Sequence, residues 1–290
     1  MTTITLTAGS SVPWATPADW PGTANTIECW ASGGGGCSHL FNAGGPSGGG
    51  GGAYARISNV TLAAGNYFFS VGIGGQGERT LTAALAGTPT YFGGSASATA
   101  STQAIVAAAA GNARTGTSLG AGLAGNTSSC IGTTKFNGGQ GGATTATINS
   151  GGGGGSGGGQ GANGGNGQSG RSLSAGTATT GGNGGACSGG GSGGAGGNST
   201  ASLSGNVGIS APFGGGGGGG GYSGANNANT PSCPGGNGGF PGGGGGGGGS
   251  NVTVGSIGGN GANGQILITY TPAAAGTVLA SKFNLLGVGI

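Results

Sequence analysis

Residues 212–222 read PFGGGGGGGGY, and the unbroken run of glycine at positions 214–221 limits what fold the chain can adopt. A second uninterrupted block fills positions 242–249. Glycine in a helix interior costs up to about 1 kcal/mol per residue relative to alanine. In a strand, glycine weakens the packing because it has no side chain. These blocks therefore argue against both a helix and an ordinary sheet.

An extended left-handed helix of the polyproline II type suits such blocks better. It has three residues per turn, rises about 3.1 Å per residue and has no internal hydrogen bonds. All-glycine helices of this kind can pack with their backbones touching, so that each N–H and C=O bonds sideways to a neighbour. Ordering glycine is costly and each hydrogen bond returns a net of only about 0.5–1.5 kcal/mol, so a closed bundle of many helices is required. The alternative is a flexible glycine linker.

Shorter glycine motifs fill the chain between residues 138 and 264. GGNGG occurs at 181–185 and 235–239, GGNGA at 258–262, and GANGGNG at 161–167. Polar or mixed segments separate the blocks, at 168–180, 198–213, 222–234 and 250–257. The spacing is irregular, whereas a regular solenoid would show a fixed period.

Composition excludes several classes of protein. The chain has 87 glycines in 290 residues and a net charge of +3, whereas charge-driven disorder needs a high net charge. Collagen needs glycine at every third position, and nucleic-acid binding needs clustered cations, which are scattered here. No window offers the roughly 20 apolar residues of a transmembrane helix. We therefore expect no nucleic-acid partner and no membrane insertion, and the N-terminus shows no secretory signal.

The chain also has few residues for catalysis. Its acidic residues are Asp19, Glu28 and Glu78, and its one histidine is His39, whereas general acid–base chemistry draws mainly on these types and lysine. We expect no enzyme and no cofactor. Cys29, Cys37 and His39 could in principle hold zinc, but their spacing is unusual and no fourth ligand is apparent, so no metal is expected.

Strand patterns lie mainly near the two ends of the chain. Apolar and polar residues alternate with the period of a half-buried strand at 3–7, 26–31, 53–60, 66–73 and 265–271, and weaker strands are expected at 90–92 and 104–110. In the clearest strand, Tyr67, Phe69, Val71 and Ile73 share one face. Residues 12–21 hold three prolines and two tryptophans, so we expect a loop there.

These patterns predict an all-β and irregular fold with essentially no α-helix. A small antiparallel β layer from the N- and C-terminal strands would join a bundle of polyglycine II helices. We divide the chain into a β-rich region with the first glycine blocks (1–110), a glycine scaffold with loops (111–264), and a closing strand with an apolar tail (265–290). The last part would pack back on the N-terminal β layer, so that the three regions form one compact unit.

The ordered set of motifs resembles a known family. The set comprises a Trp/Pro segment at 14–20, a strand running into GGGG at 27–36, GGGGGAYAR at 48–56, GNYFFSVGIGGQG at 65–77, YFGG at 91–94, and GANGQILITY at 261–270. It is similar to the glycine-rich tail proteins of tailed bacteriophages and prophages, and more loosely to tail-fibre tip adhesins built on polyglycine II helices.

This resemblance implies a virion protein of the phage tail, made in the host cytoplasm. In such adhesins the glycine helices are a rigid scaffold, and the loops bind a host receptor, either an outer-membrane protein or a polysaccharide. Other tail or fibre subunits would be further partners, and a homotrimer is one open arrangement. A structural fibre protein without a receptor role is the main alternative. An ice-binding protein would need regular triplet repeats, and the glycine blocks here are irregular. An extracellular matrix protein would need a signal peptide, and we find none in the sequence.

Carried over to this chain, the resemblance places binding in the segments between the glycine blocks, together with 78–89 and 126–137. Aromatic residues and arginine contribute most to binding hot spots. The receptor-binding candidates are Tyr222, Phe136, Lys135, Arg171, Phe213, Phe240, Asn226 and Asn227. For Phe213 and Phe240, the alternative is that they cap the ends of the glycine slab.

Two further features depart from the family pattern. The C-terminal tail is strongly apolar, so it could dock on a neighbouring subunit or complete the core of its own chain, and we favour docking. The docking candidates are Leu279, Phe283, Leu285, Leu286, Val288 and Ile290. The chain also has five cysteines, at 29, 37, 130, 187 and 233. An odd number allows at most two intrachain bridges, and the sequence leaves their connectivity open.

Overall fold

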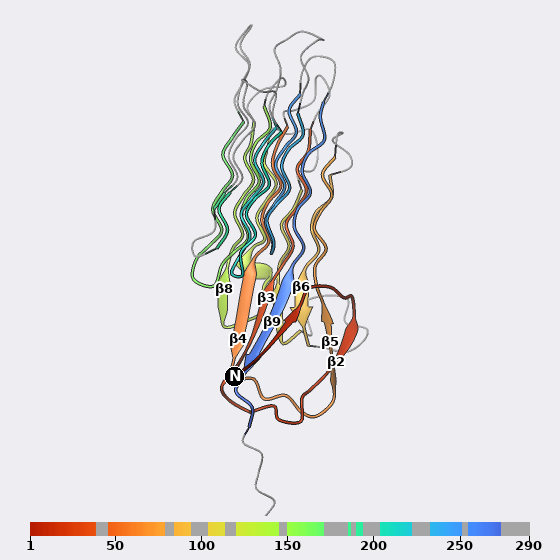
Figure 1. Ribbon diagram of the computed structural model, residues 1–290, viewed down its shortest axis with the longest axis vertical. Coiled ribbons are helices and arrows are strands. Elements are labelled where there is room, and N and C mark those ends of the chain that lie inside the picture. The colour runs from red at the N-terminus through yellow and green to blue at the C-terminus, as the bar shows by residue number, and fades with distance from the viewer. Residues whose placement is uncertain are drawn as a thin grey trace, which may run out of the picture.

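The computed structural model describes residues 1–38, 46–78, 84–93, 104–113, 120–144, 150–170, 185–186, 190–193, 204–221, 233–250 and 255–273. Within these residues, the strands gather at one end of the molecule, and long extended segments run side by side away from them (Figure 1). We call this second part the glycine layer. Its principal segments are residues 31–38, 46–53, 150–158, 214–221 and 242–250.

The strands form two antiparallel sheets. The five-stranded sheet has the order β1 (Thr2–Leu6), β9 (Gln265–Tyr270), β3 (Asn25–Trp30), β4 (Tyr54–Ser58) and β8 (Thr134–Phe136). The four-stranded sheet has the order β2 (Val12–Ala15), β5 (Asn66–Ser70), β6 (Thr90–Phe92) and β7 (Val106–Ala108). Among the described residues, the one helical element is a short 3-10 helix, η1 (Thr127–Ser129). The predicted all-β class with essentially no α-helix is therefore confirmed for the described chain.

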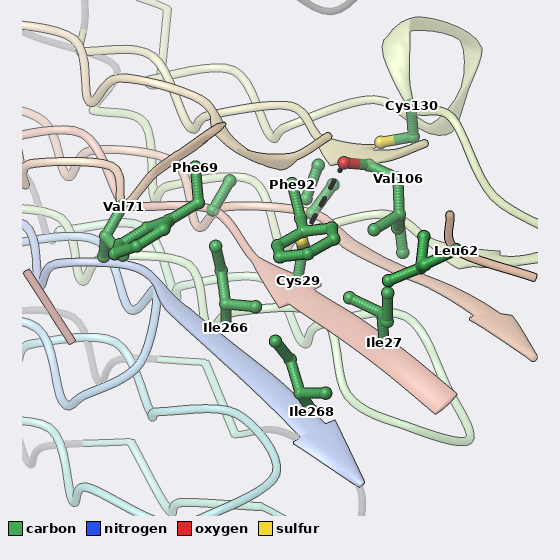
Figure 2. Packing of buried hydrophobic residues seen from close by; sticks show 14 of the residues in the cluster. Ile27, Cys29, Leu62, Phe69, Val71, Phe92, Val106, Cys130, Ile266 and Ile268 are labelled. Atoms are coloured by element: carbon green, nitrogen blue, oxygen red, sulfur yellow. Dashed lines mark hydrogen bonds between the residues drawn. The ribbon is translucent and has the colours of Figure 1, made fainter. Parts of the chain in front are cut away.

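Apolar side chains of both sheets form the core (Figure 2). Ile27 of β3 and Ile266 and Ile268 of β9 are fully buried, as are Phe92 of β6 and Val106 of β7. These residues follow the period-2 alternation of their strands, because alternate side chains point to the same face. β9 pairs with β1 on one side and β3 on the other, so the C-terminal strand lies between two N-terminal strands.

Two loop predictions are wrong. Residues 12–21 contain β2, which pairs with β5 and lies at the edge of its sheet, where Pro13 can be accommodated although it has no N–H to donate. Residues 126–137 contain β8, which pairs with β4 at the edge of the other sheet. Both strands are short, and neither shows a clear alternation.

One strand ends earlier than its pattern predicts. The alternation over 66–73 places Ile73 on the same face as Phe69 and Val71, but β5 ends at Ser70. Phe69 and Val71 are buried, whereas Ile73 is 67% exposed. Within residues 71–78, which follow β5, the exposed residues are Ile73 and Gln76, three positions apart. The period therefore changes from two to three where the chain enters the glycine layer.

The backbone hydrogen bonds of the glycine layer repeat every third residue. Along 48–53, successive N–H groups donate to three different neighbouring segments in turn, and the fourth residue returns to the first neighbour. The donor and acceptor pairs are Gly48 to Gly142, Gly49 to Gly245, Gly50 to Asn112, Gly51 to Gly139, Gly52 to Gly242, and Ala53 to Ala109. An isolated sheet cannot produce this pattern, because its strands bond in one plane.

In the other principal segments, too, successive N–H groups donate to different neighbouring segments in turn, and the pattern repeats every third residue. In 151–158, the N–H groups of Gly152, Gly155 and Gly158 all donate to the segment 46–52, while the residues between them donate to two other segments. Backbone groups thus bond on all sides of a segment. The glycine layer is stabilised by peptide groups in its interior, where the β sandwich uses side chains.

Candidate binding sites

The asparagines of the glycine motifs complete the hydrogen bonding of outer segments. In each case the side-chain Oδ1 accepts a bond from a backbone N–H of the adjacent segment. The bonds run from Asn137 N–H to Asn163 (2.9 Å), from Gln140 N–H to Asn166 (2.8 Å), from Gly77 N–H to Asn260 (2.8 Å), and from Gly74 N–H to Asn263 (2.9 Å). Sequence reasoning missed this role, although the three-residue spacing of Asn163 and Asn166 was a signal for it.

Amide side chains also line a groove on the glycine layer, between the segments 120–126 and 136–144. Its volume is about 390 Å³, and the lining side chains that the structure describes are all uncharged. The larger side chains that line this amide-lined groove are Asn112, Leu123, Asn126, Asn137, Gln140 and Asn166. The predicted binding segment 126–137 includes Asn126 and Asn137, but sequence reasoning singled out none of these side chains, since they come from several separate segments.

Three of these amides are fixed by hydrogen bonds to the backbone. Asn126 Oδ1 accepts from Ser128 N–H at 2.9 Å and thereby caps η1. Asn137 Oδ1 accepts from Thr127 N–H at 2.7 Å. Asn166 is held in the same way by the bond already described from Gln140 N–H.

Asn112 and Gln140 differ from those three amides. The main chain of Asn112 bonds within the layer, where its carbonyl accepts from Gly50 N–H at 3.0 Å. Both residues are exposed. Their side-chain amides make no hydrogen bond to any other described residue.

A second pocket lies where the glycine layer meets the strands. Its volume is about 340 Å³, and it is lined by Ser210, Ala211, Pro212, Phe240 and Gln265. Ser210 Oγ accepts from the N–H of Phe240 at 2.9 Å. Gln265 is 9% exposed, and its Oε1 has no hydrogen-bond partner among the described residues.

The structure removes Lys135 and Phe136 from the predicted loop, because both lie in β8. The ring of Phe136 stacks on Tyr54, with 6.2 Å between ring centroids and 23° between planes. Lys135 is exposed, and its Nζ donates to the carbonyl of Cys130 at 3.3 Å. Phe136 therefore lies in a strand and not in a loop, and its contribution to receptor binding stays a prediction.

Phe213 and Phe240 lie at turns where glycine segments meet the strand end of the molecule. Phe213 is 41% exposed and precedes the segment 214–221, while Phe240 precedes the segment 242–250. Gly242 N–H donates to the carbonyl of Asn263, two residues before β9. These positions are the ones that a role in capping the glycine slab requires.

The remaining candidates lie outside the described residues. This holds for Arg171, Tyr222, Asn226 and Asn227. It also holds for the six docking candidates of the C-terminal tail, Leu279, Phe283, Leu285, Leu286, Val288 and Ile290. The four receptor-binding candidates that the structure describes, Lys135, Phe136, Phe213 and Phe240, lie near the strands.

A buried carboxylate lies beneath the second face of the five-stranded sheet. Glu28 is 5% exposed and accepts hydrogen bonds from the Tyr54 hydroxyl and from Gln160 Nε2, the latter at 3.1 and 3.0 Å to its two oxygens. Burial and the neighbouring Glu28 raise the pKa of Tyr54. The carboxylate is thus engaged by structural partners.

Of the described cysteines, Cys29, Cys37 and Cys130 are free thiols, and Cys233 is buried. Burial raises the pKa of Cys29 well above its ordinary value, so this thiol stays protonated and unreactive. No group of residues suited to a metal ion occurs in the described parts of the chain. Cys187, and His39 of the zinc hypothesis, lie outside those parts.

Comparison with protein-family models and with curated proteins gives no match for this chain. Among the described residues, no helix has the length and apolar character needed to cross a membrane.

Proposed function

We propose that this protein is a component of a phage tail fibre or tail tip that attaches the virion to the host surface. In this proposal the segments of the glycine layer adopt the polyglycine II conformation and act as a rigid scaffold. The loops between them bind the receptor, an outer-membrane protein or a polysaccharide. The protein is not an enzyme and needs no cofactor.

The observation that carries the proposal is the three-residue rotation of hydrogen bonds in the glycine layer. A left-handed helix with three residues per turn presents its peptide groups in three directions in this way. Because each interior segment is bonded to neighbours on all sides, the layer resists bending and shear. Loops on a rigid scaffold are a general solution for binding.

The path of the chain supports a binding role for the loops far from the strands. Gly215 N–H bonds to Pro241 near the strands, whereas Gly221, six residues further along, bonds to Gly247 at the other end of the segment. Tyr222 follows immediately in sequence. At about 3.1 Å per residue, this loop begins roughly 20 Å from the strand end.

Purified, fluorescently labelled protein tested on a panel of bacterial strains would examine this proposal. We expect saturable binding to some strains and competition with adsorption of the corresponding phage. Heat-unfolded protein is the control. Absence of saturable binding to every strain that the phage infects would overturn the receptor role and leave the purely structural alternative.

A further inference from the structure

We propose that the amide-lined groove is a binding site for a neutral saccharide chain. This inference goes beyond loop-mediated attachment, since the groove lies between the segments 120–126 and 136–144 on the glycine layer. It rests on residues that the structure describes and stands independently of the loops that begin at residues such as Tyr222.

The chemistry of the lining selects this class of ligand. Each amide offers an acceptor oxygen and two N–H donors, and each sugar hydroxyl both donates and accepts. Among the described lining residues there is no cation to neutralise a phosphate or sulfate. Ligand pockets for drug-like apolar molecules are lined mainly by hydrophobic side chains, whereas here Leu123 is the one large apolar side chain among the described lining residues.

The groove is also preorganised for binding. The oxygens of Asn126, Asn137 and Asn166 are already bonded to backbone N–H groups. Their Nδ2 groups donate to no described residue, and the bonds to Oδ1 hold these groups in fixed orientations. Fixed side chains lose little rotamer entropy when a ligand binds, which favours affinity.

Leu123 adds an apolar surface to the groove, and Gln140 adds a side chain with both a donor and an acceptor. Leu123 is 59% exposed and offers an apolar surface for the C–H face of a sugar ring. The Gln140 side chain provides both a donor and an acceptor that no described residue occupies. Lining side chains recur every third residue along each segment, at Leu123 and Asn126 and at Asn137 and Gln140; of these four, Asn137 is half-buried and the others are exposed.

The test uses the full-length protein and defined neutral oligosaccharides as probes: maltohexaose, mannohexaose, cellohexaose and chitohexaose. Binding is measured by saturation-transfer NMR and titration calorimetry. The variants Gln140→Ala and Asn112→Ala each remove an amide that makes no hydrogen bond within the described structure. Gln76→Ala is the matched control, because Gln76 is also an exposed amide on a glycine-layer segment but does not line the groove.

We expect at least one neutral probe to bind, with affinity about tenfold weaker in Gln140→Ala and in Asn112→Ala and unchanged in Gln76→Ala. Gln140→Glu keeps the side-chain length but loses the donors, and it should weaken binding similarly. Thermal unfolding establishes that each variant is folded. No binding of any neutral probe, equal loss in Gln76→Ala, or preferential binding of a heparin oligosaccharide would each overturn the inference.

The outcome separates this inference from the proposed attachment function. If the protein binds host cells but no neutral probe, the groove inference fails and the loops carry attachment alone. If the probes bind at the groove but cells are not bound, the attachment proposal fails while the saccharide site stands.

Discussion

Gly217 illustrates why the glycine layer cannot tolerate side chains. A Cβ built at this position would lie within 3.0 Å of the Gly154 carbonyl on the adjacent segment, a distance that real Cβ atoms do not show. The obstacle is backbone, so no side chain can rotate away to make room. Glycine is needed here for close approach of segments, and its conformational freedom is incidental.

Replacing Gly217 by alanine should therefore destabilise the protein by about 3 kcal/mol or more, because the segments must separate. The measurement is the free energy of unfolding in denaturant. Gly161→Ala is the matched control, since a Cβ at Gly161 meets no atom within 4 Å, and we expect a change close to zero. Equal stability of the two variants would contradict a tightly packed layer.

Tyr54 leads to a prediction about alkaline stability. Its pKa is raised in the folded protein by burial and by Glu28, so above about pH 10 the unfolded chain loses this proton first. The stabilisation from the neutral hydroxyl is complete below that pH and is lost as the pH rises. Tyr54→Phe removes the hydrogen bond to the Glu28 carboxylate and should cost roughly 1.5–3 kcal/mol at neutral pH.

The difference in unfolding free energy between wild type and Tyr54→Phe should then narrow between pH 10 and pH 11. Comparing the two proteins cancels the contributions of the other titrating groups that they share. A difference that stays constant over this range would show that the Tyr54 hydroxyl does not control alkaline stability.

At the scale of elements, the period of the sequence decided which strands could be predicted. β3, β5 and β9 have clear alternation, and the predictions 26–31, 66–73 and 265–271 contain almost all of their residues. β8 has only Thr134–Phe136, too few residues for a period to be visible. Ile73 was misplaced because the change from two-residue to three-residue period has no marker in the sequence apart from the glycines that follow.

The C-terminal strand β9 is required for the β sandwich to fold. Among the described strands, β1 has β9 as its one sheet partner, and Ile266 and Ile268 belong to the core. A chain ending at Gly264 loses both isoleucines, each worth about 2–5 kcal/mol. We expect this chain to be unfolded by circular dichroism and to aggregate.

A chain ending at Ala273 keeps β9 but lacks the apolar tail, and it serves as the matched comparison. If the tail docks on another subunit, this chain should keep its melting temperature and show weaker self-association or fibre assembly by light scattering. Loss of folding in this shorter chain would instead assign the tail to the protein's own core.

At the scale of the whole molecule, the candidate site was harder to predict than the fold. Aromatic residues near glycine blocks were chosen because of their chemistry, but sequence does not say at which end of a segment a loop emerges. Phe213 and Tyr222 flank the same glycine block, 214–221, and therefore flank opposite ends of one extended segment. The amide-lined groove was missed for a related reason, since its side chains meet only after segments from 112 to 166 have packed.

Because Phe213 and Tyr222 flank opposite ends of the same glycine block, replacing each of these two aromatic residues in turn tests which end binds the receptor. If the loops far from the strands bind the receptor, Tyr222→Ala should weaken adsorption to host cells roughly tenfold or more, as expected for an aromatic hot spot. Phe213→Ala, at the strand end of the same block, should leave adsorption unchanged. Adsorption is measured with purified protein on susceptible cells, and thermal unfolding shows whether both variants are folded. If Phe213→Ala weakened adsorption and Tyr222→Ala left it unchanged, the receptor site would instead lie at the junction between the glycine layer and the strands.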